Sequence, residues 1–191
     1  APFYARVEVD SPWFNAAPTG SQSHGMYIGN GDQDNYVKVA VHANNGAGGI
    51  EVVVEDNGSV VEKTIYPVAG MLSAIEANLY ISVDPATGII QPRVQLDTGS
   101  IIDLGTPLSV SGALLDALQS PATALAVGVI GTSGSDPDYG ATWDELEVAY
   151  ETVGTNALIA TDPQELLFSS QGINTVLSLI HISEPTRQKP I

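Results

Sequence analysis

The sequence contains no cysteine, which excludes a disulfide framework, a thiolate metal site and a cysteine nucleophile. Basic residues are scarce as well, since six Lys and Arg stand against 22 Asp and Glu and the formal net charge is −16. Such a negative field repels phosphate backbones and anionic membrane surfaces, so no nucleic-acid partner is expected. No apolar run approaches the ~20 residues that a membrane-spanning helix needs, so no membrane insertion is expected either.

Apolar and turn-forming residues are both plentiful. The hydrophobic fraction is 43%, and 19 Gly and 12 Pro are spread over 191 residues, a composition that suits one core with many turns. The acidic residues are scattered singly, which is typical of the solvated surface of a folded domain. These properties indicate a globular domain rather than a disordered acidic chain.

The segment 25–41 predicts a β-hairpin, because two alternating runs flank six turn-forming residues, 30–35. Residues of one parity are apolar and those of the other parity are mostly polar. The residues expected to face the core are Met26, Ile28, Val37, Val39 and Val41.

The rest of the chain shows about ten short strands separated by turns, which predicts an all-β fold, an antiparallel β-sandwich or jelly roll, with one or two short helices. Helical spacing of apolar residues indicates these helices within 67–77 and 111–119. Residues 124–131 are apolar on both faces, which favours a central strand covered on each side.

Four stretches resemble concanavalin A-like lectin/glucanase domains. They are GMYIGNGDQDNYVKVAV (25–41), LYISVDPATG (79–88), LAVGVIGTS (125–133) and ATWDELEV (141–148). The resemblance implies a concanavalin A-like jelly roll over residues 1–152, with its true start expected upstream.

Two C-terminal stretches carry other resemblances. DPQELLFSSQGINTV (162–176) is similar to the opening strands of an immunoglobulin-like repeat of bacterial surface proteins. We therefore expect residues 153–176 to be a linker and the truncated start of such a domain. LSLIHISEPTR (177–187) resembles a translated sequencing adapter, so residues 177–191 are expected to be an artefact tail. These resemblances imply one module of a large secreted or cell-surface protein, with other domains of the same chain as partners.

An enzyme is not expected. The glucanases that the resemblance includes use two carboxylates in a Glu-x-Asp-x-Glu run, and the sequence has no such run. Glu51 and Glu55 share one face of a predicted strand, but Val53 stands between them, and the acids of 144–147 have the wrong spacing.

A sugar site needs aromatic side chains ringed by hydrogen-bonding groups. Six residues are expected on the non-core sides of their strands, where one concave sheet could hold them all, and Trp13 is expected on a loop at the rim. The six are Tyr4, Arg6, Tyr36, Lys38, Tyr80 and Arg93. The alternative is that each merely covers a neighbouring strand.

The resulting expectation is a non-catalytic, lectin-like carbohydrate-binding module, with a glycan or polysaccharide as its partner. The alternative is a structural or adhesion spacer without a small-molecule ligand, and a glycoside hydrolase ranks third. The resemblance to secreted proteins places the module outside the cell or on its surface.

A structural calcium ion is the only cofactor considered. Asn30, Asp32 and Asp34 place oxygen-bearing side chains at alternate positions of a Gly-bearing loop, although a hairpin tip favours Asn and Asp for backbone reasons too. Strand alternation points Asp144 toward the apolar layer, where a carboxylate needs a hydrogen bond or a metal. The resemblance implies a calcium ligand at this position, and hydrogen bonds to a turn are the alternative.

Overall fold

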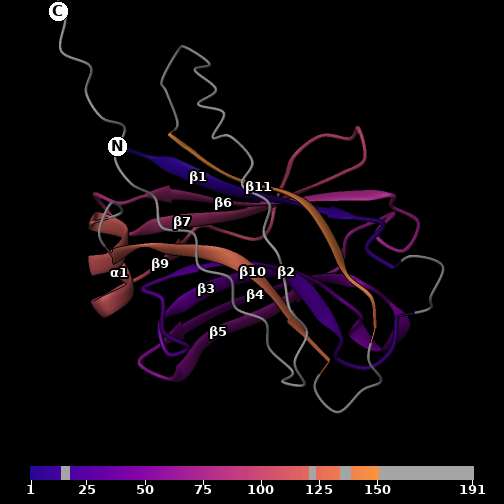
Figure 1. Ribbon diagram of the computed structural model, residues 1–191, viewed down its shortest axis with the longest axis horizontal. Coiled ribbons are helices and arrows are strands. Elements are labelled where there is room, and N and C mark those ends of the chain that lie inside the picture. Colours follow the sequence, from indigo (N-terminus) through magenta and orange to yellow (C-terminus); the bar gives the residue numbers. More distant parts are fainter. Residues whose placement is uncertain (14–17, 121–123, 134–138, 151–191) are drawn as a thin grey trace, which may run out of the picture.

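The computed structural model describes residues 1–13, 18–120, 124–133 and 139–150. They form two antiparallel sheets stacked in two layers (Figure 1), which confirms the all-β sandwich. The strands are β1 (Phe3–Asp10), β2 (Ser23–Gly29), β3 (Tyr36–His42), β4 (Gly49–Asp56), β5 (Ser59–Tyr66), β6 (Glu76–Asp84), β7 (Ile89–Leu96), β8 (Ile102–Asp103), β9 (Leu108–Ser109), β10 (Ala126–Thr132) and β11 (Thr142–Tyr150). The expected linker and immunoglobulin-like segment, 153–176, and the adapter-like tail, 177–191, lie outside the described residues.

The two layers have different strand orders. Sheet A runs β11-β1-β6-β7-β8, with β9 also paired to β7, and sheet B runs β10-β2-β3-β4-β5. In Figure 1 the strands β1, β6 and β7 lie above β3, β4 and β5. The apolar rows of the two sheets face each other, as the alternation in the sequence predicts.

The core fills the space between the sheets with aliphatic side chains. Val7 and Leu79 of sheet A and Met26 and Val39 of sheet B are fully buried. Burial of one such side chain contributes on the order of 1.5–3 kcal/mol. This shared core holds the outer faces of both sheets in fixed positions.

The predicted hairpin is confirmed as β2 and β3. Met26 pairs with Val39 and Ile28 with Val37, and all four are buried. Tyr27 pairs with Lys38 on the opposite side. The hairpin therefore contributes one face to the core and the other to the outside of sheet B.

One of the two expected helices is present. Helix α1 (Gly112–Gln119) buries Leu114 and Leu118. Residues 67–75 instead form turns, in which Met71 N donates to Val68 O at 3.2 Å. Gly70 has a φ of 85°, a left-handed conformation that a helix cannot contain. A short 3₁₀ turn, η1 (Asn44–Gly46), follows β3.

The expected central position of 124–131 is wrong. Strand β10 pairs only with β2 among the described residues and ends sheet B. Residues Ala126 to Val129 are nevertheless buried. The apolar pattern therefore indicates that both faces of this strand are covered. A strand at the edge of a sheet can be covered in this way as well as a central one.

A β-bulge changes the orientation of β11. Val7 pairs with Leu146, but Val9 pairs with Trp143, so the register shifts by one residue between them. Trp143 consequently packs on the core, and Asp144 is exposed. The expectation that Asp144 points inward is wrong, because a bulge interrupts the alternation on which it rested.

Candidate functional site: a pocket on the outer face of sheet B

The outer face of sheet B carries polar side chains that are withdrawn from solvent. Tyr27, Lys38 and Glu51 are only 3%, 8% and 2% exposed, although none of them belongs to the core between the sheets. Polar groups buried in this way need partners. The outer face of sheet B is therefore the best candidate for a functional site in the described part of the chain.

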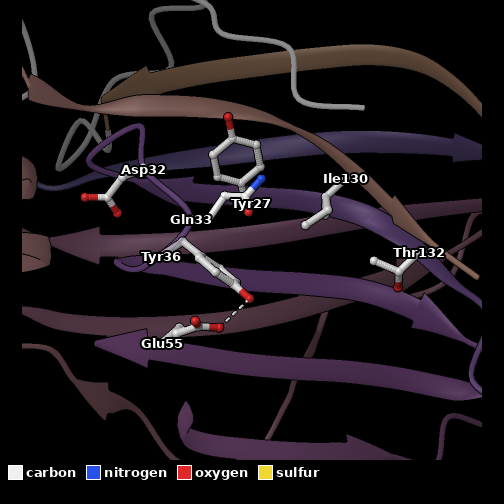
Figure 2. A pocket seen from close by; sticks show the side chains of 7 residues that line it. All are labelled: Tyr27, Asp32, Gln33, Tyr36, Glu55, Ile130 and Thr132. Carbon is white, nitrogen blue, oxygen red and sulfur yellow. Dashed lines mark hydrogen bonds between the residues drawn. The ribbon is translucent and has the colours of Figure 1, made fainter. Parts of the chain in front are cut away.

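A pocket of about 250 Å³ lies on this face. Figure 2 shows its walls rising from neighbouring strands, with the hairpin tip at one end. Aromatic rings, carboxylates, an amide, a hydroxyl and one aliphatic side chain line it together, a mixture typical of sites for small polar ligands. The described residues that line it are Tyr27, Asp32, Gln33, Tyr36, Glu55, Ile130 and Thr132.

Within the part of the chain that the structure describes, the hydroxyl of Tyr27 has no hydrogen-bond partner. It is buried, and no described group lies within bonding geometry of it. Burial also raises the pKa of Tyr27, so the hydroxyl stays protonated at neutral pH and can donate as well as accept. A buried hydroxyl without a partner costs about 1–3 kcal/mol, and a bound ligand would remove this cost.

Tyr36 and Glu55 face each other across β3 and β4, which pair at these residues. The Tyr36 hydroxyl donates to Glu55 Oε2 at 2.8 Å, the dashed line in Figure 2. Burial, followed by this bond and the charge of Glu55, raises the pKa of Tyr36. Oε1 of Glu55 accepts no hydrogen bond within the described part of the chain.

Asp32 closes the pocket at the hairpin tip. Its carboxylate accepts the backbone N–H of Asp34 at 2.9 Å and side-chain N–H groups of Asn30 and Asn35 at 2.7 and 3.2 Å. Desolvation acts to raise the pKa of Asp32, but these bonds outweigh it and lower the pKa. Asp32 is therefore a fixed negative charge.

A chain of polar contacts crosses sheet B beside the pocket. Thr132 Oγ1 lies 2.8 Å from Ser23 Oγ, and the Lys38 ammonium donates to the same Ser23 oxygen at 3.4 Å. Lys38 also pairs with Glu51, whose other oxygen lies 3.1 Å from Lys63 Nζ and 3.8 Å from His42 Nε2. We call Thr132, Ser23, Lys38, Glu51 and Lys63 the polar chain.

Glu51 stays ionised within the polar chain. Burial acts to raise its pKa, but the charges and hydrogen bonds of Lys38 and Lys63 outweigh burial and lower the pKa. The buried carboxylate and the buried ammonium of Lys38 thus compensate each other.

No protein-family model and no curated protein sequence matches this chain. Among solved structures, the chain is similar to that of a functionally unknown protein from Saccharomyces cerevisiae. The TM-score is 0.57 at 15% sequence identity, over 79% of this chain and 70% of that one. A likeness at this identity shows a shared fold and carries no function.

The structure separates the six predicted sugar-binding residues into two groups. Tyr36 and Lys38 lie on sheet B, whereas Tyr4, Arg6, Tyr80 and Arg93 lie on sheet A. The six residues therefore do not share one sheet, which the sequence left open. Alternation predicts which residues face away from the core, but it does not tell which sheet a strand joins.

On the outer face of sheet A the side chains bind one another. Arg6 contacts Glu8, Glu145 and Glu147 and donates to Asn78, and Tyr4 donates to Glu147 at 3.1 Å. Two further residues of the predicted set are engaged in the same way: Tyr80 donates to Gln95 and Arg93 donates to Asp103 and Ser82.

Trp13 lies in the core and not at a rim. It is 8% exposed and packs edge-on against His24, with ring centroids 5.6 Å apart. Tyr139 and Trp143 contact other sides of the same imidazole. Burial of the Trp13 side chain is favourable because its large ring is mostly apolar.

The predicted calcium residues do not gather into one group. Asn30, Asp32 and Asp34 lie at the hairpin tip and Asp144 on the bulge of β11. No three acidic or histidine side chains in the described part of the chain could hold a metal ion together. Calcium binding stays a prediction.

Sequence reasoning missed Tyr27, Gln33, Ile130 and Thr132 as pocket residues. A signal for Tyr27 existed, because the alternation that sends Met26 and Ile28 inward sends Tyr27 outward beside Lys38. Thr132 lies 109 residues from Ser23 in the chain, and only the pairing of β10 with β2 brings it to the site. The described chain also has no helix that is long and apolar enough to cross a membrane.

Proposed function

We propose that the chain is a non-catalytic carbohydrate-binding module whose saccharide occupies the pocket on sheet B. The observation that carries this proposal is the buried hydroxyl of Tyr27, a pocket-lining residue, which lacks a partner among the described residues, while the other walls of the pocket offer donors and acceptors. A sugar hydroxyl supplies both a donor and an acceptor. The rings of Tyr27 and Tyr36 add apolar surface against which a pyranose can pack.

The resemblance of residues 25–41 and 141–148 to concanavalin A-like lectin/glucanase domains supports this reading. Such a jelly roll is compatible with two stacked antiparallel sheets. On the same ground we propose an extracellular or cell-surface location and a multidomain parent protein.

The state of the carboxylates supports binding without hydrolysis. A glycosidase needs one carboxylic acid with a raised pKa beside a second carboxylate. Glu51 is paired with two lysines and its pKa is lowered, so it is a poor proton donor. Glu55 accepts the hydroxyl of Tyr36.

The test is a glycan array followed by calorimetric titration of each hit with wild type and Tyr27→Phe. We expect saturable binding that falls about tenfold in the variant, because one hydrogen bond is lost. Tyr80→Phe is the matched control, since it removes a tyrosine hydroxyl from sheet A and should leave binding unchanged. Silence of wild type across all sugars, or equal binding by Tyr27→Phe, would overturn the proposal.

One observation favours the alternative of a structural or adhesion spacer. The polar side chains of the outer face of sheet A bond to one another, as in the contacts of Arg6 with Glu145 and Glu147, and this face is suited to solvation rather than recognition. A silent array together with an unchanged melt in every saccharide supports the spacer.

Calcium is a separate proposal for the hairpin tip. The carboxylate of Asp34 accepts no hydrogen bond from the described residues, while Asp32 and Asn30 stand at alternate positions beside it. Since a ligand held only by the folded state stabilises that state, calcium should raise the melting temperature and a chelator should reverse the rise. An unchanged melt removes these residues and Asp144 from consideration as ligands.

A further inference from the structure

The charge of the pocket is of one sign. Among the described residues that line it, the only acidic side chains are Asp32 and Glu55, and no Lys, Arg or His is present. Tyr27 and Tyr36 are neutral, because burial raises the pKa of both. The whole chain adds to this field with a net charge of −16. An anion approaching the pocket therefore meets repulsion at long and at short range.

The two lysines on the same face, Lys38 and Lys63, already form ion pairs with Glu51. Lys38 is buried against Glu51 and Ser23, and Lys63 reaches Glu51 from β5. Neither lysine lines the pocket. A negatively charged ligand would thus find no counter-charge on the described walls, whereas a positively charged one would find two.

The hydrogen-bonding groups of the pocket also favour a positively charged ligand. Carboxylates only accept hydrogen bonds, and Glu55 Oε1 receives none from the described chain. Hydrogen-bond donors on the ligand are therefore bound more strongly in this pocket than acceptors are. An ammonium group gains more than a hydroxyl, because a charge-assisted bond is about twice as strong as a neutral one.

We propose that this pocket selects sugars that carry a free amino group and rejects sugars that carry carboxylate or sulfate groups. This inference rests on the proposed saccharide site. Glu55 is the residue that sets the preference, as its free oxygen faces the ammonium group of the ligand. Tyr27 and Thr132 bind ring hydroxyl groups and contribute equally to charged and neutral sugars.

The test compares two oligosaccharides that differ only in this charge. Tetramers of β-1,4-linked glucosamine and of its N-acetylated form are titrated at pH 6 and low ionic strength, with an oligogalacturonate as the anionic probe. We expect the amino form to bind about tenfold more tightly than the acetylated form, and the anionic probe to show no binding. Because exposed charges are screened, high salt should reduce the difference.

Glu55→Gln keeps the shape of the side chain and removes its charge. It should remove most of the preference for the amino form and leave only the part that the charge of Asp32 contributes. Asp116→Asn, an exposed position on α1, removes the same charge from a helix that contributes none of the described pocket residues and should retain the preference. Tighter binding of the acetylated or anionic sugar, or a preference that Glu55→Gln leaves undiminished, overturns this inference alone. Absence of binding to every sugar overturns the proposed function as well.

Discussion

Lys38 and Glu51 form an ion pair on adjacent strands of sheet B, with side chains only 10% and 3% exposed. Both charged groups are buried away from solvent, so each depends on the opposite charge of the other to offset the cost of its desolvation. The pair also links β3 to β4 on the face that carries the pocket. Substitution of either residue alone should therefore lower the free energy of unfolding more than it lowers the affinity for a ligand.

We predict that Glu51→Gln lowers the free energy of unfolding by about 3 kcal/mol, because it leaves the buried Lys38 ammonium without a counter-charge. Urea unfolding followed by tryptophan fluorescence measures the change. The double variant Lys38→Met with Glu51→Leu should return to within about 1 kcal/mol of wild type, since an apolar pair of similar size carries no desolvation cost. A single variant as stable as wild type would show that the pair contributes nothing.

The same pair should respond to acid. The pKa of Glu51 is lowered because the two lysines outweigh the effect of burial. Its contribution is therefore complete above the ordinary carboxyl pKa of about 4.3 and is lost as the pH falls below that value. The loss of stability below pH 4 should be smaller in the Lys38→Met, Glu51→Leu variant than in wild type.

His24 should act in a different pH range. It is 1% exposed, both ring nitrogens lack partners among the described residues, and burial lowers its pKa from 6.5 to about 4. Since the unfolded chain takes up the proton first, stability is complete above pH 6.5 and falls toward pH 4. The shift corresponds to a loss of about 3 kcal/mol.

His24→Phe isolates this contribution, because it keeps a ring among Trp13, Tyr139 and Trp143 and removes the titrating group. Urea unfolding at pH 7, 5.5 and 4 should show wild type losing about 3 kcal/mol more than the variant over this range. Parallel pH dependences of the two proteins would mean that His24 is not held neutral in the fold.

Arg6 is expected to hold the outer face of sheet A together. It contacts Glu8, Glu145 and Glu147, so Arg6→Met leaves three carboxylates close together without a cation. We predict a loss of about 2 kcal/mol in the free energy of unfolding. Because salt weakens the repulsion that remains, the loss should be smaller in 0.5 M salt.

Arg93 provides the comparison on the same face. It pairs with Asp103, whose side chain is 62% exposed, and such exposed pairs contribute less than about 1 kcal/mol. Arg93→Met should therefore cost less than Arg6→Met. Equal losses would indicate that burial does not distinguish the two pairs.

The local geometry of the hairpin was predictable from the sequence. Side chains alternate with a period of two along a strand, so the apolar residues Met26, Ile28 and Val37 fix one face and leave Tyr36 and Lys38 on the other. The turn residues between 30 and 35 fix where the chain reverses. Each of these features depends on neighbours within the segment.

The pocket was not predictable in the same way, because it depends on long-range pairing. Thr132 reaches Ser23 only because β10 pairs with β2, and Tyr4 and Tyr36 lie apart only because β1 and β3 join different sheets. One bulge in β11 also moves Trp143 inward and Asp144 outward. No local pattern encodes these pairings.

The Tyr27 hydroxyl gives a prediction about stability that is independent of any ligand. Tyr27→Phe removes a buried group that has no partner among the described residues, so the ligand-free protein should gain about 1 kcal/mol and melt several degrees higher. Tyr36→Phe removes the same atom from the same pocket but breaks the 2.8 Å bond to Glu55, and should lose about 1 kcal/mol. Thermal melts of the two variants should therefore move in opposite directions. Destabilisation by Tyr27→Phe would mean that this hydroxyl has a partner in the free protein, which removes the reason for placing a ligand beside it.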